Sequence, residues 1–395
     1  MKVLYITVSM PYGDGEPFFV PEIRETLRQG CELLIVPRSP GGKVTNRDAE
    51  GLENLSLSRP LFCWEIFTVA LGMVLRHPLR TLRTLWWLFV SRNVTTFIKN
   101  LAAYPKALWI AHTARHWGAD FIHAHWANTP ATMALVASEF THIPWGCTAH
   151  RIDILDDNLL WLKMNHAAFF RFIARDGEVL ARSKCRRPIL GNLVVLHLGA
   201  DCPSIVRFKQ TISFPPFLVC AGALSQRKGQ RFLIEAMRIL RERGIAIRLT
   251  LVGAGEERQN IVALIEQHGL ENCITLLGQL DHAELLKLWD SGEVDIAVLP
   301  SLHEGIPLTL IEPMACGIPV VGTTVGGVPE LLERGAGILI PPQDAVALAD
   351  AIQKLITEPG FRQSIAECGR RRVLEGWAVE NIVRQWMELV QRAIH

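Results

Sequence analysis

The sequence lacks several features that would assign it to a simple structural class. Nine cysteines are scattered along its 395 residues, and none forms a C-x-x-C pair. A chain of this length can build a hydrophobic core without disulfides, so we expect free thiols and a reducing, cytoplasmic compartment. No internal repeat or low-complexity tract interrupts the sequence.

The sequence also has neither a large excess of one charge nor a long hydrophobic run. Lys and Arg total 41 against 39 Asp and Glu, and a net charge of +2 argues against a general nucleic-acid-binding protein. The apolar run at residues 61–75 is broken by Glu65 and is too short for a membrane span. The N-terminal run MKVLYITVSMPYG has no small-residue cleavage site, so we interpret residues 3–8 as a buried strand and not as a signal peptide.

The length of the chain exceeds what a single core usually supports, which predicts two domains. Short apolar stretches typical of buried strands alternate with helical stretches in both halves. This alternation predicts an α/β fold.

Residues 301–330, SLHEGIPLTLIEPMACGIPVVGTTVGGVPE, are the most informative stretch. They follow an apolar strand candidate, so Glu304 should lie in the loop at its carboxyl end, where open parallel sheets bind ligands. Gly305 lets the backbone approach a ligand closely, and Pro307 is suited to the start of a helix. A helix N-terminus at this place favours an anion such as a diphosphate.

Two glutamates, Glu304 and Glu312, frame this helix start with seven residues between them. Together with GIPVV and GGVPE, they resemble the donor-site signature of retaining glycosyltransferases of family 4. The sequences IHAHWANTPA and PWGCTAH resemble members of that family that assemble bacterial surface polysaccharides, including exopolysaccharides. The resemblance implies the GT-B architecture, in which two Rossmann-like, doubly wound α/β domains face each other across a cleft.

The resemblance also divides the chain. Residues 1–205 would be the N-terminal, acceptor-side domain, and residues 206–375 the domain that binds the nucleotide sugar. The terminal helix, residues 376–395, would return to the N-terminal domain.

In the family, the turn after the first strand of the second domain typically reads G-R-L, three residues, then K-G. Here the turn begins at Gly222, and Lys228 matches the lysine that neutralises the departing diphosphate. Ala223 stands where the arginine is usual, which leaves Arg227 or a basic group of the first domain as alternative sources of the missing charge.

The resemblance assigns further roles. Glu312 would accept hydrogen bonds from the ribose hydroxyls and Glu304 from hydroxyls of the donor sugar, while His150, at a strand's carboxyl end, would contact that sugar. The candidate catalytic residues are therefore His150, Lys228 and Glu304. The candidate donor-binding residues are Gly13, Gly15, Gly222, Arg227, Gly305, Ile306, Pro307, Leu308 and Glu312.

No cofactor is expected beyond the donor substrate itself, a UDP- or GDP-sugar whose hexosyl unit would be transferred with retention of configuration. No D-x-D motif lies on a plausible loop, so we expect transfer without a metal ion. His123 and His125 have a spacing that could suggest a metal pair, but no third ligand is visible in the sequence.

Residues 59–115 combine basic residues with leucine and tryptophan at helical spacing. This pattern predicts an interfacial helix on anionic lipid, at the inner face of the cytoplasmic membrane. The alternative is that the apolar face packs on the sheet while the arginines are solvated. A nucleic-acid partner is not expected, because no recognised binding module accompanies the patch. The basic residues in question are Arg76, Arg80, Arg83, Arg92, Lys99 and Lys106.

The sequence therefore predicts a glycosyltransferase that extends a lipid-linked saccharide or oligosaccharide acceptor. Two alternatives stay open. A sugar-nucleotide epimerase of the same fold would leave the basic region without a purpose. A catalytically weak scaffold that binds nucleotide sugar or membrane in an assembly complex would explain Ala223.

Overall fold

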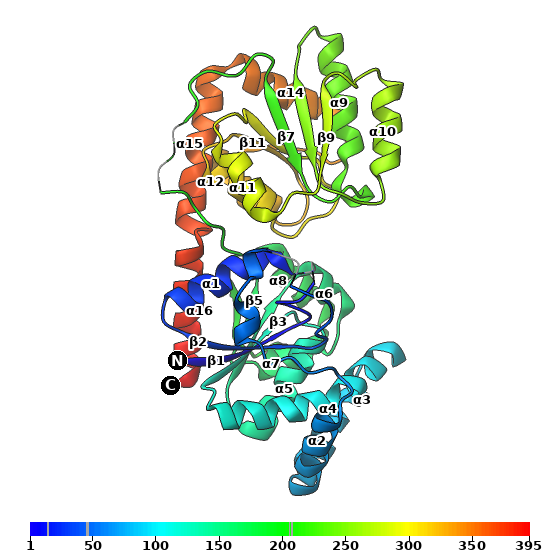
Figure 1. The fold of residues 1–395 in the computed structure, drawn as a ribbon, viewed down its shortest axis with the longest axis vertical. Coiled ribbons are helices and arrows are strands. Elements are labelled where there is room, and N and C mark those ends of the chain that lie inside the picture. The colour runs from blue at the N-terminus through cyan, green and yellow to red at the C-terminus, as the bar shows by residue number, and fades with distance from the viewer. Residues whose placement is uncertain (14–15, 45–46, 205, 207) are drawn as a thin grey trace. The chain divides into compact units, whose positions relative to one another are not determined.

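The computed structural model of the chain describes residues 1–13, 16–44, 47–204, 206 and 208–395. Two compact units make up the fold (Figure 1). Unit 1 comprises residues 1–197 and 382–395, and unit 2 comprises residues 198–381. The boundaries between the units lie at 197/198 and 381/382. The boundaries predicted from the sequence were 205/206 and 375/376.

Unit 1 is built on a six-stranded parallel sheet in the order β2-β1-β3-β4-β5-β6. Its strands are β1 (Lys2–Thr7), β2 (Glu32–Pro37), β3 (Phe121–His125), β4 (Trp145–Ala149), β5 (Phe169–Phe172) and β6 (Leu193–Val195). Its helices are α1 (Val20–Arg28), α2 (Trp64–Arg76), α3 (Pro78–Phe89), α4 (Val94–Trp117), α5 (Thr129–Thr141), α6 (Arg151–Asp156), α7 (Leu160–His166), α8 (Arg175–Lys184) and most of α16 (Val379–Ile394).

Unit 2 repeats the design with a parallel sheet in the order β12-β11-β10-β7-β8-β9. Its strands are β7 (Phe217–Ala221), β8 (Arg248–Val252), β9 (Ile274–Gly278), β10 (Ile296–Leu299), β11 (Val320–Thr323) and β12 (Ile338–Ile340). Its helices are α9 (Gln230–Glu242), α10 (Arg258–Gln267), α11 (His282–Asp290), α12 (Leu308–Ala315), α13 (Val328–Leu332), α14 (Ala345–Thr357) and α15 (Pro359–Gly376). The predicted α/β fold class is confirmed.

Each sheet reverses its direction of strand addition once. In unit 1 the reversal lies between β1 and β3, and in unit 2 it lies between β7 and β10. Loops that leave the carboxyl ends of the two strands at such a switch point diverge to opposite faces, which opens a crevice that ligands occupy. The strand order therefore marks one candidate site in each unit.

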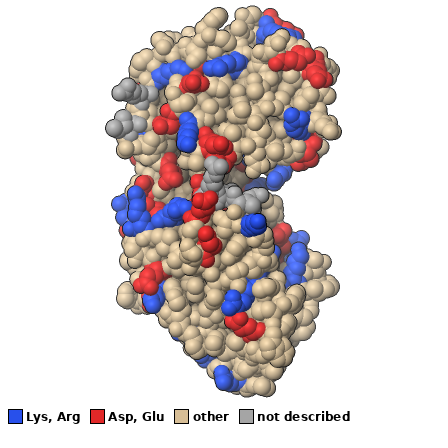
Figure 2. All heavy atoms as spheres, viewed as in Figure 1, with Lys and Arg blue, Asp and Glu red and all other residues tan. Residues whose placement is uncertain are grey.

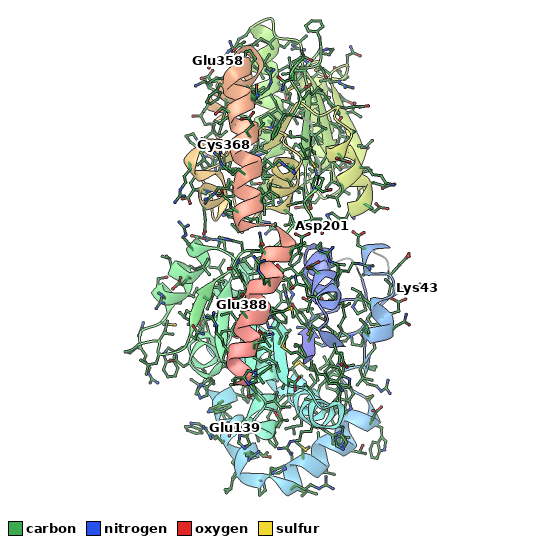
Figure 3. The ribbon with its side chains drawn as sticks, turned by 90° about the vertical axis from the view of Figure 1, so that its left-hand side faces the viewer. Lys43, Glu139, Asp201, Glu358, Cys368 and Glu388 are labelled. Atoms are coloured by element: carbon green, nitrogen blue, oxygen red, sulfur yellow. The ribbon has the colours of Figure 1, made fainter. Side chains whose placement is uncertain are left out.

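The two C-terminal helices pack on different units. Helix α15, which follows the labelled Glu358 and includes Cys368, runs along unit 2, and α16, which includes Glu388, runs along unit 1 (Figure 3). In α16, Ile382, Trp386 and Val390 are buried in a hydrophobic cluster with residues of β1 and β3. Burial of one face of this amphipathic helix anchors the chain's end on unit 1.

The basic, tryptophan-rich region forms α2, α3 and α4. Lys106 was predicted as part of its basic surface, and this is wrong: its side chain is fully buried. Its ammonium donates to the carbonyls of Pro37, Arg38 and Arg59 at 2.5, 2.9 and 2.6 Å, which satisfies all three of its donors. Lys106 therefore ties α4 to the end of β2.

Within the described part of the chain, no helix is both long and apolar enough to cross a bilayer.

Candidate functional site

At the switch point of unit 2, the loops that follow β7 and β10 are joined to each other. A 3-10 turn, Gln226–Lys228, lies between β7 and α9, and residues 300–307 connect β10 to α12. The backbone N–H of Leu302 donates to the carbonyl of Arg227 at 2.7 Å. Side chains from the two loops are therefore held at fixed positions relative to each other.

Lys228 and Glu304 meet across these loops. The Lys228 ammonium lies 2.6 Å from Glu304 Oε1, and the Ser301 hydroxyl donates to the same oxygen at 2.6 Å. The two side chains are only 20% and 9% exposed, so water screens their attraction weakly. The structure thus brings together two of the three predicted catalytic residues.

Two glycines allow this close packing. A Cβ on Gly229 would lie 2.2 Å from the carbonyl oxygen of Pro300, and one on Gly326 would lie 2.0 Å from that of Glu304. Both glycines have positive φ, 65° and 53°, which side chains disfavour. The loop that carries Glu304 is therefore supported from both sides by backbone that only glycine can provide.

Helix α12 starts directly after this loop, with Pro307 as its N-cap. The first-turn N–H groups of Leu308 and Thr309 have no partner within the helix, and with the helix dipole they favour an anion. Ile306 and Pro307 are buried, whereas Gly305 remains partly accessible in front of the helix. The predicted loop and helix start thus lie together at the switch point.

Glu312 projects from α12 and is 3% exposed. Its Oε1 pairs with His282 Nε2 at 2.8 Å, while its Oε2 is buried without a hydrogen-bond partner among the described residues. An unsatisfied buried carboxylate oxygen is costly, so it calls for a ligand donor such as a hydroxyl. His282 was missed by the sequence analysis, although its place just after Asp281, which caps α11, puts it at a helix start.

Around Gly222 the site is less charged than the family pattern implies. Gly222 lies against the aliphatic part of Lys228, since a Cβ at Gly222 would sit 3.5 Å from Lys228 Cε. Ala223 and Arg227 are both exposed. Arg227 is therefore close in the chain to Lys228, and its backbone carbonyl accepts from Leu302.

In unit 1, the loop after β1 is organised by Glu16, which the sequence analysis missed. Its carboxylate accepts from the backbone N–H groups of Ser9 and Met10 at 2.6 and 2.7 Å and from the Trp126 indole at 2.5 Å. Gly13 has φ of 74°, as expected for a glycine in a tight turn. Gly15 lies outside the described residues.

His150 lies at the N-terminus of α6, inside an aromatic cluster at the switch point of unit 1. Its Nε2 is 2.9 Å from His125 Nε2, and His125 Nδ1 is 2.8 Å from the Tyr5 hydroxyl. The Trp126 and Phe18 rings flank His150 with centroids 4.4 and 5.2 Å away. The spacing of His123 and His125 thus serves a buried hydrogen-bonded network, because His123 Nε2 pairs with the Thr148 hydroxyl at 3.0 Å.

Burial lowers the pKa of His150 to about 3 and the pKa values of His123 and His125 well below 6.5, with the Arg171 charge acting in the same direction. His150 is therefore a neutral imidazole at physiological pH.

This pKa shift makes a prediction about stability. Between pH 6.5 and about 3 the unfolded chain protonates His150 and the folded chain does not, so stability falls as the pH drops through this window. His150 should contribute about 1.4 kcal/mol per pH unit to the slope of the unfolding free energy in this window. The variant His150→Gln should lack that contribution, so its stability should fall less steeply as the pH drops. Urea denaturation of the wild type and of His150→Gln at a series of pH values measures this difference. If their plots of unfolding free energy against pH stay parallel below pH 6.5, the lowered pKa of His150 is contradicted.

Among the described residues, no group of three or more His, Cys, Asp or Glu side chains is arranged to hold a metal ion.

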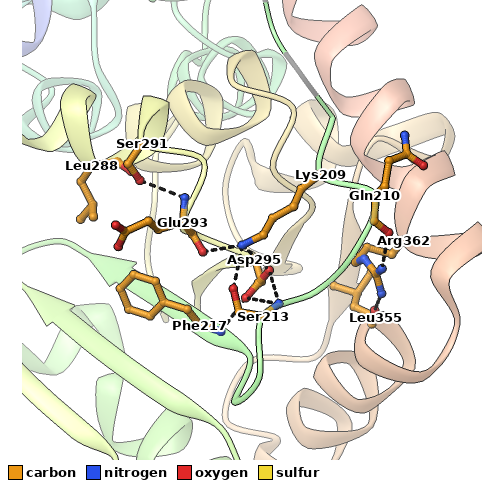
Figure 4. Close-up of polar contacts among 10 residues, drawn as sticks. All are labelled: Lys209, Gln210, Ser213, Phe217, Leu288, Ser291, Glu293, Asp295, Leu355 and Arg362. Carbon is orange, nitrogen blue, oxygen red and sulfur yellow. Dashed lines mark hydrogen bonds and ion pairs between the residues drawn. The ribbon is translucent and has the colours of Figure 1, made fainter.

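Outside these contacts the described residues line further cavities, of which two bear on the location of the site. One of about 550 Å³ in unit 1 lies beside the carboxyl ends of β2 and β3, and its lining includes Arg38, Lys99, Asn128 and Asn158. The other, about 330 Å³, lies in unit 2 at the opposite, amino end of β10, where Lys209 pairs with Asp295 at 2.8 Å (Figure 4). Only the first lies on the edge of its sheet where the candidate residues gather.

Comparison with known proteins matches part of unit 2 to a known family. Residues 205–372 match the family model "Glycosyl transferases group 1". The putative colanic acid biosynthesis glycosyltransferase WcaL of Salmonella typhimurium is 33% identical over 208 residues, covering 50% of this chain and 51% of the relative. The amylovoran biosynthesis glycosyltransferase AmsK of Erwinia amylovora is 31% identical, covering 47% of each chain. The chain thus spans about half the length of the curated relatives it matches.

Among solved structures, Anabaena Alr3699/HepE in complex with UDP has a TM-score of 0.72 at 19% identity, covering 99% of this chain and 100% of that chain. At this identity the likeness shows the fold. The chain has the two-unit GT-B fold, its residues 205–372 match the glycosyltransferase group 1 family model, and the resemblance to family 4 glycosyltransferases of surface-polysaccharide synthesis is confirmed.

Proposed function

We propose that the chain transfers a hexosyl unit from a UDP- or GDP-sugar to a lipid-linked saccharide during surface polysaccharide synthesis, with retention of configuration. The observation that carries this proposal is the placement of the Lys228 ammonium and the N-terminus of α12 at one switch point. Together they provide positive charge at the place where open α/β sheets bind phosphorylated ligands.

In this mechanism Lys228 and the free N–H groups of α12 stabilise the negative charge that grows on the diphosphate as the glycosidic bond breaks. Glu304 would accept hydrogen bonds from donor-sugar hydroxyls while it holds Lys228 in place. Before the donor binds, the carboxylate of Glu304 and the ammonium of Lys228 balance each other's charge, so neither is buried as an isolated ion. The acceptor hydroxyl oxygen then bonds to the sugar's anomeric carbon from the face that the diphosphate leaves, and its proton passes to the departing diphosphate, without a metal ion.

The role proposed for Glu312 is to hold the ribose. Its unpartnered Oε2 can accept from one ribose hydroxyl, and Oε1 is already oriented by His282. Gly222, Gly305 and Ile306 would line the diphosphate path. The roles of His150 at the donor sugar and of Gly13 in the first loop rest on the family resemblance.

For the acceptor, the 550 Å³ cavity of unit 1 is suited to a polar, phosphate-bearing head group. Arg38 and Lys99 supply positive charge, and Asn93 and Asn158 supply amide groups. Relatives named for colanic acid and amylovoran biosynthesis agree with a saccharide acceptor of this kind. We place the chain at the inner face of the cytoplasmic membrane, where such acceptors are extended.

A second candidate function is a weakly catalytic or inactive partner that binds nucleotide sugar without turnover. Ala223 favours it, because the family's arginine is absent there. Loss of one donor to a charge that develops in the transition state typically lowers the rate about 100-fold or more.

A thermal-shift panel with UDP, GDP, ADP and CMP and their sugars tests donor binding, because a ligand of the folded state raises the melting temperature. We expect one nucleoside diphosphate to stabilise the wild type, and Glu312→Gln to weaken its binding about 10-fold or more through loss of a charge-assisted hydrogen bond. The 2′,3′-dideoxy analogue should bind both proteins equally. The assigned ribose contact is wrong if no nucleotide raises the melting temperature of the wild type. It is also wrong if Glu312→Gln weakens binding of the nucleotide and of its dideoxy analogue equally.

A further inference from the structure

Helices α2 and α3 turn apolar side chains toward the solvent. Trp64, Leu79 and Trp86 are 82%, 80% and 70% exposed, and Leu71, Leu75 and Leu82 are exposed as well. On α2 the exposed positions recur every three or four residues, as on one face of a helix. We call these six side chains the outer apolar face.

In α3 two threonines are buried while several large apolar side chains are exposed. Thr81 and Thr84 are buried, and the Thr84 hydroxyl pairs with that of Tyr104 at 2.7 Å, while Leu79, Leu82 and Trp86 point outward. Leaving large apolar side chains in water forfeits the free energy that their burial would supply. Such a surface indicates a partner that covers it.

The helices are fixed in this orientation by contacts on their inner side. Ile66 and Met73 of α2 and Leu88 of α3 are buried in the hydrophobic core of unit 1. Arg80 donates to the carbonyl of Phe140 at 2.7 Å, and Arg83 pairs with Glu139 at 3.0 Å, which fastens α3 to α5. Rotation of α3 to hide its leucines would break these contacts.

The charge around the outer apolar face is positive. Residues 59–115 contain eight Lys and Arg and a single acid, Glu65, which pairs with Arg59 at 2.6 Å. Arg76, Arg92 and Lys99 are exposed near the face. On the side of the molecule seen in Figure 2, the surface over α2 and α3 is mostly uncharged, with isolated charged side chains. A second copy of the chain would bring like charges together, whereas anionic phospholipid would complement them.

The dimensions of the helices indicate how lipid would be bound. Helices α2 and α3 have 13 and 12 residues, fewer than the roughly 20 that a transmembrane helix needs. A short helix with an apolar face and flanking arginines lies in the plane of the membrane, with its apolar side chains at the boundary between head groups and acyl chains. Tryptophan is favoured at that depth.

We propose that α2, α3 and the start of α4 form a docking surface for an anionic phospholipid bilayer. The outer apolar face enters the interface, and Arg76, Arg92 and Lys99 contact the phosphate head groups. The docking surface shares no residue with the donor site in unit 2, so vesicle binding tests it independently of the proposed transfer reaction. Lys99 also lines the 550 Å³ cavity, so a docked bilayer would present head groups next to it.

Co-sedimentation of the full chain with vesicles tests this surface. Binding to vesicles that contain phosphatidylglycerol should exceed binding to pure phosphatidylcholine about 10-fold and should weaken at about 1 M salt, where the Debye length is ~3 Å. The triple variant Leu71→Gln, Leu79→Gln, Trp86→Gln should lose about 10-fold or more in partitioning. A matched control, Leu190→Gln, Phe214→Gln, Val346→Gln, removes exposed apolar side chains elsewhere and should bind like the wild type.

A charge variant, Arg76→Glu with Arg92→Glu, keeps the test decisive if the triple variant fails to fold. It should lose binding to anionic vesicles, and its melting temperature should fall by only about a few degrees, because the pair that Arg92 forms with Asp157 at 3.7 Å is largely exposed. Equal binding of wild type and either variant would overturn the proposal. So would a wild-type dimer, detected by light scattering, that the triple substitution dissociates, since a second copy would then cover the face.

Discussion

Replacing Lys228 with methionine should lower the rate of sugar transfer about 10²- to 10³-fold, because the leaving diphosphate loses a preorganised positive charge. The KM for the donor should rise less than kcat falls, since the charge on the diphosphate is largest in the transition state. Initial-rate kinetics with labelled nucleotide sugar measure both. Arg231→Met, which removes an exposed cation near the start of α9, is the matched control and should keep the wild-type rate.

This substitution also affects stability, and the design must separate the two effects. Without Lys228, the carboxylate of Glu304 stays buried with the Ser301 hydroxyl as its remaining partner among the described residues. Losing one member of a buried ion pair costs about 3 kcal/mol. The double variant Lys228→Met, Glu304→Gln removes the isolated charge, so its melting temperature should recover while its activity stays low. Recovery of activity together with stability would show that Lys228 has only a structural role.

The largest effect on folding should come from the buried pair of Arg171 and Glu22 in unit 1. Two guanidinium nitrogens donate to the two carboxylate oxygens at 2.8 Å each, and Arg171 Nε donates to the carbonyl of Leu196 at 2.8 Å. Arg171→Met should cost about 3–5 kcal/mol, because it leaves the Glu22 charge buried without its main partner. This corresponds to a loss of roughly 10 °C in melting temperature.

The double variant Arg171→Met, Glu22→Leu should recover part of this loss, since replacing both ions by apolar groups removes the uncompensated charge. An exposed pair gives the control: Arg243 lies 2.7 Å from Asp350 at the surface, and Arg243→Met should cost less than about 1 kcal/mol. Thermal unfolding followed by circular dichroism compares the three. Equal losses for Arg171→Met and Arg243→Met would contradict the assigned importance of the buried pair.

Local sequence patterns predicted the secondary structure around the donor site. The strand predicted before residue 301 is observed as Ile296–Leu299, and the helix predicted after Pro307 is observed as Leu308–Ala315. Apolar runs, glycines and a proline fix these bounds, and all act within a few residues. The long helix α15 was not predicted, because its hydrophobic pattern is weak.

Pairings across the sheet could not be predicted in this way. Lys228 meets Glu304 because β10 is added next to β7, and the order of strands is a property of the whole sheet. The contact of His125 with His150 likewise depends on β3 lying beside β4. The sequence suggested that these residues have roles but did not identify their partners.

Periodicity also failed to show which face of α3 is exposed. Its threonines and its leucines both recur at helical spacing, and packing against Tyr104 and α5 placed the threonines inside. Lys106 was misjudged for the same reason, since the three carbonyls that bind it come from distant segments. Tertiary contacts override the local preference of a side chain in both cases.

The measurement that tests the central claim most directly is transfer of labelled sugar from the nucleotide sugar that the thermal-shift panel selects. The acceptor would be total lipid from a polysaccharide-producing bacterium. The account predicts label in the lipid-linked saccharide fraction with the wild type and almost none with Lys228→Met, Glu304→Gln. Saturable binding of the nucleotide sugar without any transfer to lipid or saccharide would contradict it and would identify the chain as a binding partner of the assembly enzymes.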